Sequence, residues 1–295
     1  MTTARVAVVG GGISGVACAL ELHRAGIAVD LFDRGHRLGG RMATRTLRNT
    51  GLGFDGRVVD LGAAYFTTRD ATFGLVVESW ISRGLAREWT DTFTVVDPEG
   101  ITGVRTGPMR YAATFGLRSL VEDLANELPS VRNPHEVSDV IRAANGVLVD
   151  GEPYDAAALA MPAPQSADLT GEDAEPVRWE PVLALVAAYA ERSWHEFDAM
   201  FVNDSAVLSF IADDGKRRGD DAPVLVAHSG AVLAAGHLDD PGAVAPLLLA
   251  ALRHSVKSSA DPDWFELKRW SLARPITAHP EPFGLVDGIG WCGDG

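Results

Sequence analysis

The sequence contains little cysteine and no excess of positive charge. Cys18 and Cys292 are the two cysteines in 295 residues, and they lie far apart along the chain. Two isolated thiols form neither a disulfide framework nor a metal site. Aspartate and glutamate number 40 against 26 lysines and arginines, which gives a formal net charge of −14. Nucleic acids and anionic membranes attract basic surfaces, so this balance argues against both as partners.

Long hydrophobic runs are also missing. No apolar run approaches the roughly 20 residues that a membrane-spanning helix needs. Residues 6–22 are apolar enough to suggest a secretion signal, but glycines interrupt them and no basic segment precedes them. We therefore expect a soluble, cytoplasmic protein. With 46% hydrophobic and 22% charged residues, the chain has an ordinary globular composition, and its length allows two domains.

The sequence lacks the residue patterns of hydrolytic and metal-dependent enzymes. It shows no Ser-His-Asp set, no paired-carboxylate signature and no metal-ligand spacing, so we predict no metal site. The histidines are scattered without a ligand pattern, and we interpret them as surface or structural residues. They include His36, His135, His195, His228, His237, His254 and His279.

The chain does contain a glycine-rich turn between a predicted strand and a predicted helix. Residues 5–9 form an apolar run that leads into the sequence GGGISG at 10–15. A helical pattern follows, and a second apolar run, 28–32, ends on Asp33. An isolated G-x-G-x-x-G motif is weak evidence, but the order strand, glycine turn, helix, strand, acidic residue is the dinucleotide-binding fingerprint.

Each glycine of this motif has an expected physical task. Gly10 makes the tight turn, Gly12 lets the backbone approach a pyrophosphate, and Gly15 lets the helix lie close to the strand. The helix N-terminus supplies free N–H groups and a positive dipole end for phosphates. Asp33 follows Gly15 at about the spacing of a carboxylate that accepts ribose hydroxyls.

The residues after Asp33 indicate which dinucleotide binds. Arg37 and a second glycine turn that ends on Arg41 have no task in a plain NAD domain, so they argue against an NAD(P) dehydrogenase. In a flavin enzyme, a second glycine turn brings an arginine to the FAD phosphates. The sequences GGRMATR at 39–45 and VDLGAAYFT at 59–67 resemble the renalase-like branch of the amine oxidase flavoprotein superfamily.

This resemblance implies an α/β fold in which a Rossmann-type FAD-binding domain is combined with a discontinuous α+β sheet substrate domain, similar to the amine oxidase and p-hydroxybenzoate hydroxylase folds. Residues 166–176 are polar and are predicted to form an exposed linker or loop. In the family a further helix normally follows the closing strand. The expected FAD-binding domain comprises 1–65, 108–165 and 276–295, and the expected substrate domain comprises 66–107 and 166–275.

The resemblance also implies which residues hold FAD, which we expect to bind non-covalently. Arg41 is expected at the phosphates, and Val137 lies where the superfamily uses a strand backbone to hold adenine. Gly293 and Asp294 correspond to a pair beside the ribityl and phosphate groups. The expected cofactor-binding residues are Gly10, Gly12, Ile13, Ser14, Gly15, Asp33, Arg34, Gly40, Arg41, Met42, Gly62, Ala63, Val137, Gly293 and Asp294.

Four residues are candidates for a flavin-facing catalytic pocket. Tyr65 follows a segment that passes the flavin ring in resembling enzymes, and Phe210, His228 and Trp270 lie on expected strands of the substrate domain. Ordinary packing inside a strand remains the alternative for each of them.

The few lysines bear on the choice between branches of the superfamily. Many of its amine oxidases use a lysine near the flavin N5. Lys216, Lys257 and Lys268 lie in no matching motif, which favours the renalase-like branch.

The resemblance therefore implies an FAD-dependent oxidoreductase. It would accept hydride from a small substrate, a dihydronicotinamide isomer, and O₂ would reoxidise the flavin to give H₂O₂. This substrate rests on analogy with the family and not on any particular residue. Two alternatives remain open: a flavin amine oxidase, and an FAD-binding protein without catalysis.

Overall fold

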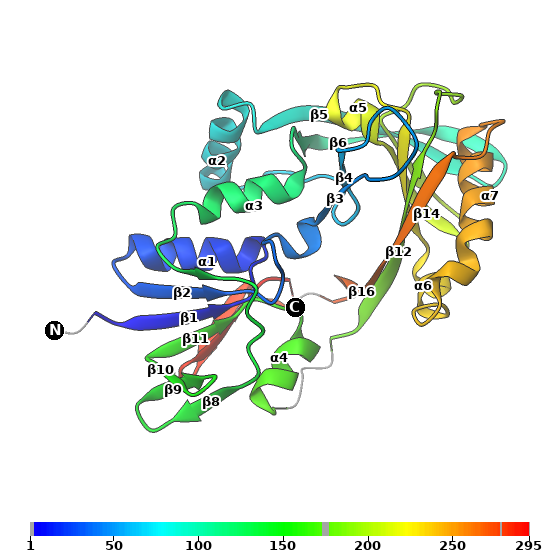
Figure 1. Cartoon of the computed structure of the whole chain (residues 1–295). Helices are drawn as coiled ribbons and strands as arrows, with labels where there is room; N and C mark the ends of the chain where they lie inside the picture. Colours follow the sequence, from blue (N-terminus) through cyan, green and yellow to red (C-terminus); the bar gives the residue numbers. More distant parts are fainter. Residues whose placement is uncertain (1–2, 173–176, 278, 295) are drawn as a thin grey trace. The chain divides into compact units, whose positions relative to one another are not determined.

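The computed structural model describes residues 3–172, 177–277 and 279–294 (Figure 1). The chain forms two compact units and leaves the first unit twice to build the second. The first unit comprises Met1–Met42, Arg118–Trp179 and Arg274–Gly295, and the second comprises Ala43–Leu117 and Glu180–Ala273. None of the described helices is long and apolar enough to cross a membrane.

The first unit is built on a six-stranded sheet in the order β17-β18-β11-β1-β2-β7. The neighbours from β18 to β7 pair in parallel, and β17 is antiparallel to β18. The helix α1 connects β1 to β2, and this strand–helix–strand unit is the one that the hydrophobic pattern predicted. The strands are β1 (Arg5–Val9), β2 (Ala28–Phe32), β7 (Val131–Arg132), β11 (Ala156–Leu159), β17 (Phe283–Val286) and β18 (Ile289–Cys292).

Both faces of this sheet are covered, which explains why β1 and β2 are apolar on both sides. Figure 1 shows α1 (Ile13–Arg24) over one face and the small antiparallel sheet of β8–β10 over the other. Val8 and Leu31 pack into the cluster on the α1 side, whereas Val9 and Phe32 pack with Val147 on the other. The remaining elements here are α3 (Leu117–Ala125), β8 (Val140–Ala143), β9 (Gly146–Val149) and β10 (Glu152–Tyr154).

The prediction of a linker over 166–176 is wrong at its start. The helix α4 spans Ala163–Thr170. Pro164 lies in its first turn, where a missing N–H costs nothing, and Gly171 ends it in the left-handed conformation at φ 67°. Residues 173–176 of the predicted linker lie outside the described residues, and so does Gly295.

The second unit contains a seven-stranded sheet in the order β16-β12-β15-β14-β13-β5-β6. The pair β13–β5 is parallel, and the pairs β5–β6, β13–β14, β14–β15 and β12–β15 are antiparallel. The strands are β5 (Ala86–Asp97), β6 (Gly100–Ala113), β12 (Trp179–Ala188), β13 (Ala199–Val202), β14 (Leu208–Asp213), β15 (Val224–Ser229) and β16 (Trp264–Pro275).

A helix covers one face of this sheet and completes the larger core. Leu248 and Leu252 of α7 (Ala245–Val256) pack with Leu185, Ile211 and Leu225 of the strands, and Figure 1 shows α7 beside β14. The smaller elements of this unit are β3 (Thr44–Thr46), β4 (Val58–Asp60), α2 (Ala71–Ser82), α5 (Asp214–Arg218), α6 (Ala231–Ala235) and a short 3₁₀ turn, Pro241–Val244.

The two compact units divide the chain at residues that differ from the predicted domain boundaries. Residues 43–65 and 108–117, assigned by resemblance to the FAD-binding domain, lie in the second unit. Residues 166–179, assigned to the substrate domain, lie in the first. The division by function given above stays a prediction.

Candidate cofactor-binding site

The first glycine turn has the geometry that its sequence predicts. Gly10 adopts φ +114°, and a Cβ there would lie 2.5 Å from the carbonyl oxygen of Ala160. A Cβ on Gly15 would overlap the carbonyl oxygen of Gly10, so only glycine lets α1 start this close to β1. Gly12 differs from both, because no described atom lies within 4 Å of a Cβ built on it. The chain itself therefore does not require glycine at position 12.

Among the described residues, no side chain caps the N-terminus of α1. Gly12 is its N-cap and offers no side chain, and the first turn carries no acidic residue. The leading N–H groups of an α-helix have no partner within the helix and prefer an anion. The open space beside Gly12 and this uncapped helix end together suit a phosphate group.

The second glycine turn is attached directly to the first. The Gly39 N–H donates to the carbonyl oxygen of Gly11 at 2.8 Å. A Cβ on Gly40 would lie 3.2 Å from the Gly12 Cα, so the two turns touch. The short 3₁₀ turn Gly40–Met42 then places Arg41 next to the start of α1.

Arg41 forms a forked ion pair with Asp294. Its Nη1 donates to Asp294 Oδ2 at 2.8 Å, and its Nη2 donates to Oδ1. The guanidinium also lies 5.3 Å from the ring centre of Trp179. A guanidinium held in this way presents a planar fork that matches carboxylate or phosphate oxygens. The structure thus brings together two predicted cofactor residues from opposite ends of the chain.

Asp33 lies at the end of β2 and links two loops. Its Oδ2 accepts the Gly11 N–H at 2.6 Å, and its Oδ1 accepts the Gly35 N–H at 2.7 Å. Each carboxylate oxygen has a further lone pair, so Asp33 can still accept ribose hydroxyls. The carboxylate therefore also orders the glycine turn, a role that the sequence did not reveal.

The remaining predicted residues of the first unit have more ordinary surroundings. Ile13 and Met42 join the hydrophobic cluster around α1, and Val137 is buried in the cluster on the other face of the sheet. Arg34 is exposed and lies 3.9 Å from Glu136. Ser14 lies beside Gly293, whose φ is +136°.

Arg37 has a structural partner that the sequence did not reveal. It forms a forked pair with Glu122 of α3, with nitrogen-to-oxygen distances of 2.8 and 2.7 Å. This ion pair connects the loop after Asp33 to α3, so Arg37 has a structural role in this unit.

In the second unit, the segment from Asp60 to Tyr65 is fixed by its backbone carbonyls. Arg217 donates to the carbonyl oxygens of Ala64 at 2.9 Å and Asp60 at 3.1 Å. The Trp270 Nε1 donates to the carbonyl oxygen of Leu61 at 2.8 Å. Gly62 and Ala63, both predicted at the cofactor, lie between these anchors and are partly exposed.

A buried ionic cluster supplies the arginine anchor. Asp214 at the start of α5 accepts from Arg217 and Arg57, and Arg218 pairs with Asp60 at 2.9 Å. Burial opposes ionisation of Asp214, but the guanidinium groups of Arg217, Arg218 and Arg57 outweigh it and hold the pKa of this carboxyl well below its usual range. Sequence analysis missed this cluster, because DDGKRR at 213–218 reads as an exposed charged turn.

Three of the four predicted pocket residues meet in one aromatic cluster. The ring centres of Tyr65 and Phe210 are 6.3 Å apart, and those of Phe210 and His228 are 5.6 Å apart. Phe210 and His228 are register partners across β14 and β15. Trp270 packs elsewhere in the unit, with residues such as Leu61 and Val226.

The same cluster contains residues that sequence analysis missed. Phe93 lies 5.4 Å from Tyr65, and Trp89 lies 6.3 Å from it, ring centre to ring centre. The buried Arg110 guanidinium lies 3.9 Å from the Phe93 ring centre. The alternation over 87–104 predicted strands, and it could have drawn attention to Trp89 and Phe93 as side chains of one face.

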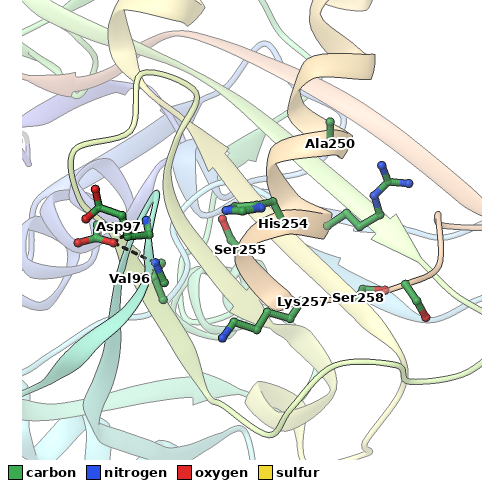
Figure 2. Close-up of a pocket in the computed structure, with 11 residues that line it drawn as sticks. Val96, Asp97, Ala250, His254, Ser255, Lys257 and Ser258 are labelled. Atoms are coloured by element: carbon green, nitrogen blue, oxygen red, sulfur yellow. Dashed lines mark hydrogen bonds between the residues drawn. The ribbon is translucent and has the colours of Figure 1, made fainter.

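A hollow in the second unit contains none of the predicted residues. It has a volume of about 570 Å³ and lies between the β5–β6 turn and the end of α7 (Figure 2). Asp97 and Glu99 line one side, and Arg253, His254 and Lys257 line the other. Asp97 accepts from the turn itself, and His254 lies 3.0 Å from the Pro98 carbonyl oxygen. These contacts explain the hollow as part of the packing of the turn.

A second cavity, of about 360 Å³, lies in the first unit. It is bordered by α4, β11 and β18, and its wall includes Trp291 and Gly293.

No group of three or more His, Cys, Asp or Glu in the described ranges is arranged to hold a metal ion.

Comparison with known proteins supports the assignment of the fold. The profile of an NAD(P)-binding Rossmann-like domain family matches residues 8–78. The structure resembles cyclohexylamine oxidase from Brevibacterium oxydans IH-35A with a TM-score of 0.74 and 15% identity, covering 99% of this chain and 93% of that one.

Two further solved structures share this fold. A protein from Exiguobacterium sp. 255-15, provisionally described as a protoporphyrinogen oxidase, gives a TM-score of 0.73 and 15% identity over 93% of this chain and 88% of its own. Putrescine oxidase with bound putrescine gives 0.66 and 16% over 90% and 85%. The predicted α/β fold with a Rossmann-like unit is confirmed.

Proposed function

We propose that this protein is an FAD-dependent oxidoreductase. The observation that carries the proposal is the contact between the two glycine turns, in which Gly39 donates to Gly11 and brings Arg41 beside the uncapped start of α1. A single glycine turn with an acidic residue after the second strand suits any dinucleotide. A second glycine turn carrying an arginine supplies a further phosphate contact.

The residues present fit a dinucleotide diphosphate. The open space at Gly12 admits a group that a Cβ would displace, and the α1 N–H groups would donate to phosphate oxygens. Arg41 would exchange the Asp294 carboxylate for phosphate oxygens of the same planar geometry. Asp33 would accept ribose hydroxyls. The adenine would lie near Val137. We propose that FAD binds non-covalently, without a bond to a cysteine sulfur.

Bound FAD would supply the redox chemistry, as an acceptor of hydride that O₂ returns to its oxidised state with release of H₂O₂. The chain's own residues would bind and orient. We propose that Gly62 and Ala63, held between the Leu61 and Ala64 carbonyl anchors, form a rigid backbone surface for the cofactor. Tyr65, Phe210 and His228 would offer aromatic faces to a planar substrate, and Trp270 would act as a positioning residue through Leu61.

We propose a dihydronicotinamide isomer as substrate, which rests on the resemblance of the segments 39–45 and 59–67 to renalase-like proteins. A flavin amine oxidase is the second candidate, and the likeness to cyclohexylamine oxidase and putrescine oxidase favours it. The surroundings of Lys216 favour the first candidate. Lys216 is engaged by Glu196 and Asp221, with nitrogen-to-oxygen distances of 3.1 and 3.0 Å.

The test is anaerobic absorbance at about 450 nm, where oxidised flavin absorbs, on protein reconstituted with FAD. We expect rapid bleaching by dihydronicotinamide isomers and none by a panel of primary and secondary amines. Bleaching by amines alone would assign the protein to the amine oxidases. A stable yellow band with both would leave an FAD-binding protein without catalysis, and a protein that retains no FAD would refute the proposal.

A further inference from the structure

The fold brings the only two cysteines of the sequence into contact. Cys18 lies on α1, one turn after Ser14, and Cys292 is the last residue of β18. The two thiols are close enough to shift each other's pKa. Both side chains belong to the hydrophobic cluster around α1, and both are partly exposed. Two residues from opposite ends of the chain therefore form a dithiol.

The two sulfur atoms affect each other's ionisation. Interaction with the Cys292 thiol lowers the pKa of Cys18 against the opposing effect of burial. The same contact and burial raise the pKa of Cys292. A thiolate is the form that attacks a peroxide, and a neighbouring thiol can resolve the product.

We propose that Cys18 and Cys292 are a peroxide-sensitive dithiol that closes reversibly to a disulfide between α1 and β18. The Cys18 thiolate attacks one oxygen of H₂O₂, forms a sulfenic acid and releases hydroxide, which takes up a proton to become water. The Cys292 sulfur then displaces the sulfenic hydroxyl as a second water and loses its proton. Overall, two thiols and one H₂O₂ give one disulfide and two waters. The two sulfurs together lose two electrons, and the peroxide gains them.

The position of this bond gives it a consequence for the first unit. Cys292 directly precedes Gly293 and Asp294, and Asp294 is the partner of Arg41. Ser14, one helical turn before Cys18, lies against Gly293. A disulfide would therefore fix the end of β18 to α1 immediately beside the residues proposed to bind phosphate. An enzyme that releases H₂O₂ would be exposed to this oxidant, but the chemistry of the pair needs only added peroxide.

The experiment treats reduced full-length protein with a graded excess of H₂O₂, blocks the remaining thiols with N-ethylmaleimide, and measures intact mass and proteolytic peptides. We expect both thiols to disappear together, a peptide that links Cys18 to Cys292, and full recovery of both thiols after dithiothreitol. No substrate or turnover is used, so failure of the proposed function would leave this result unaffected.

Single substitutions test whether both sulfur atoms are needed. In Cys292→Ser and in Cys18→Ser, we expect the remaining cysteine to form a sulfenic acid that dimedone traps, and no linked peptide. The linked peptide from the unmodified chain carries the test even if either variant folds poorly. Sulfinic or sulfonic acid on one cysteine with the other thiol still free would overturn the proposal. So would disulfides between two copies of the chain, or survival of both thiols under peroxide that oxidises glutathione in the same tube.

Discussion

Replacing Gly12 by alanine separates the requirements of the fold from those of the cofactor. A Cβ at position 12 meets no described atom within 4 Å, and φ there is −75°, which alanine adopts freely. Alanine is the poorer N-cap by about 0.5–1 kcal/mol, but it also restricts the unfolded chain by about 0.4–1 kcal/mol. These terms have opposite sign, so the free energy of unfolding should change by less than about 0.5 kcal/mol.

The affinity for FAD should respond differently. If the diphosphate passes over Gly12, the added methyl group occupies its place, and an inserted methyl group in a packed site costs about 1–3 kcal/mol. That cost corresponds to a loss of affinity of about 5- to 150-fold. The assay is titration of reduced, FAD-free protein with FAD, followed by flavin fluorescence, together with thermal unfolding of the free chain.

Gly15→Ala is the matched control in the same turn. Its Cβ would overlap the Gly10 carbonyl oxygen, so this variant should lose stability before any cofactor is added. Gly12→Ala that binds FAD as tightly as the unmodified chain would refute the proposed path of the phosphates. Equal destabilisation by both substitutions would refute the geometry of the turn itself.

Three other substitutions and one control variant test the remaining anchors. Arg41→Gln should weaken FAD binding by about 1.5–3 kcal/mol because it removes a charged fork. The control Arg37→Gln, measured by the same FAD titration, should leave the affinity unchanged. Equal losses of affinity in the two variants would refute a phosphate role for Arg41. Arg217→Met should lower the free energy of unfolding, measured with urea, by about 3–5 kcal/mol because Asp214 loses a buried partner. An unchanged midpoint of urea unfolding would contradict a stabilising role for the buried ionic cluster. Trp270→Phe should cost about 1 kcal/mol in the same measurement through the lost bond to Leu61, and no loss would show that this anchor is dispensable.

The parts of the fold that sequence analysis predicted depend on local signals. The run from β1 to Asp33 was predicted because both strands are buried on both faces and glycine punctuates the turn between strand and helix. In this segment, the residues that form β1, α1 and β2 also determine where each of them begins and ends. The start of α4 was missed because its polar composition hid the two signals that bound it, Pro164 in the first turn and Gly171 at the end.

The parts that were missed depend on partners distant in sequence. Arg217 and Asp60 are far apart along the chain, and nothing local distinguishes a buried arginine anchor from an exposed basic turn. Cys18 and Cys292 were interpreted as isolated thiols for the same reason. The alternation of a strand indicates which residues share a face, but it does not indicate which other strand supplies the facing side chains. Pairing, not propensity, decided these contacts.

Residues that would contact the dinucleotide and residues that would contact the substrate have separate tasks. The glycine turns, Asp33 and Arg41 would serve an FAD-binding protein equally well with or without turnover, since they would contact only the dinucleotide. A catalytic role must therefore come from groups that would contact the substrate, and the cluster around Tyr65 and Phe210 supplies aromatic faces with a buried guanidinium at Arg110. A cation placed against these rings competes with a cationic amine for the same π faces. Under the proposed function, an electron-rich neutral ring would avoid that conflict, so this cluster supports the proposal of a dihydronicotinamide over an amine.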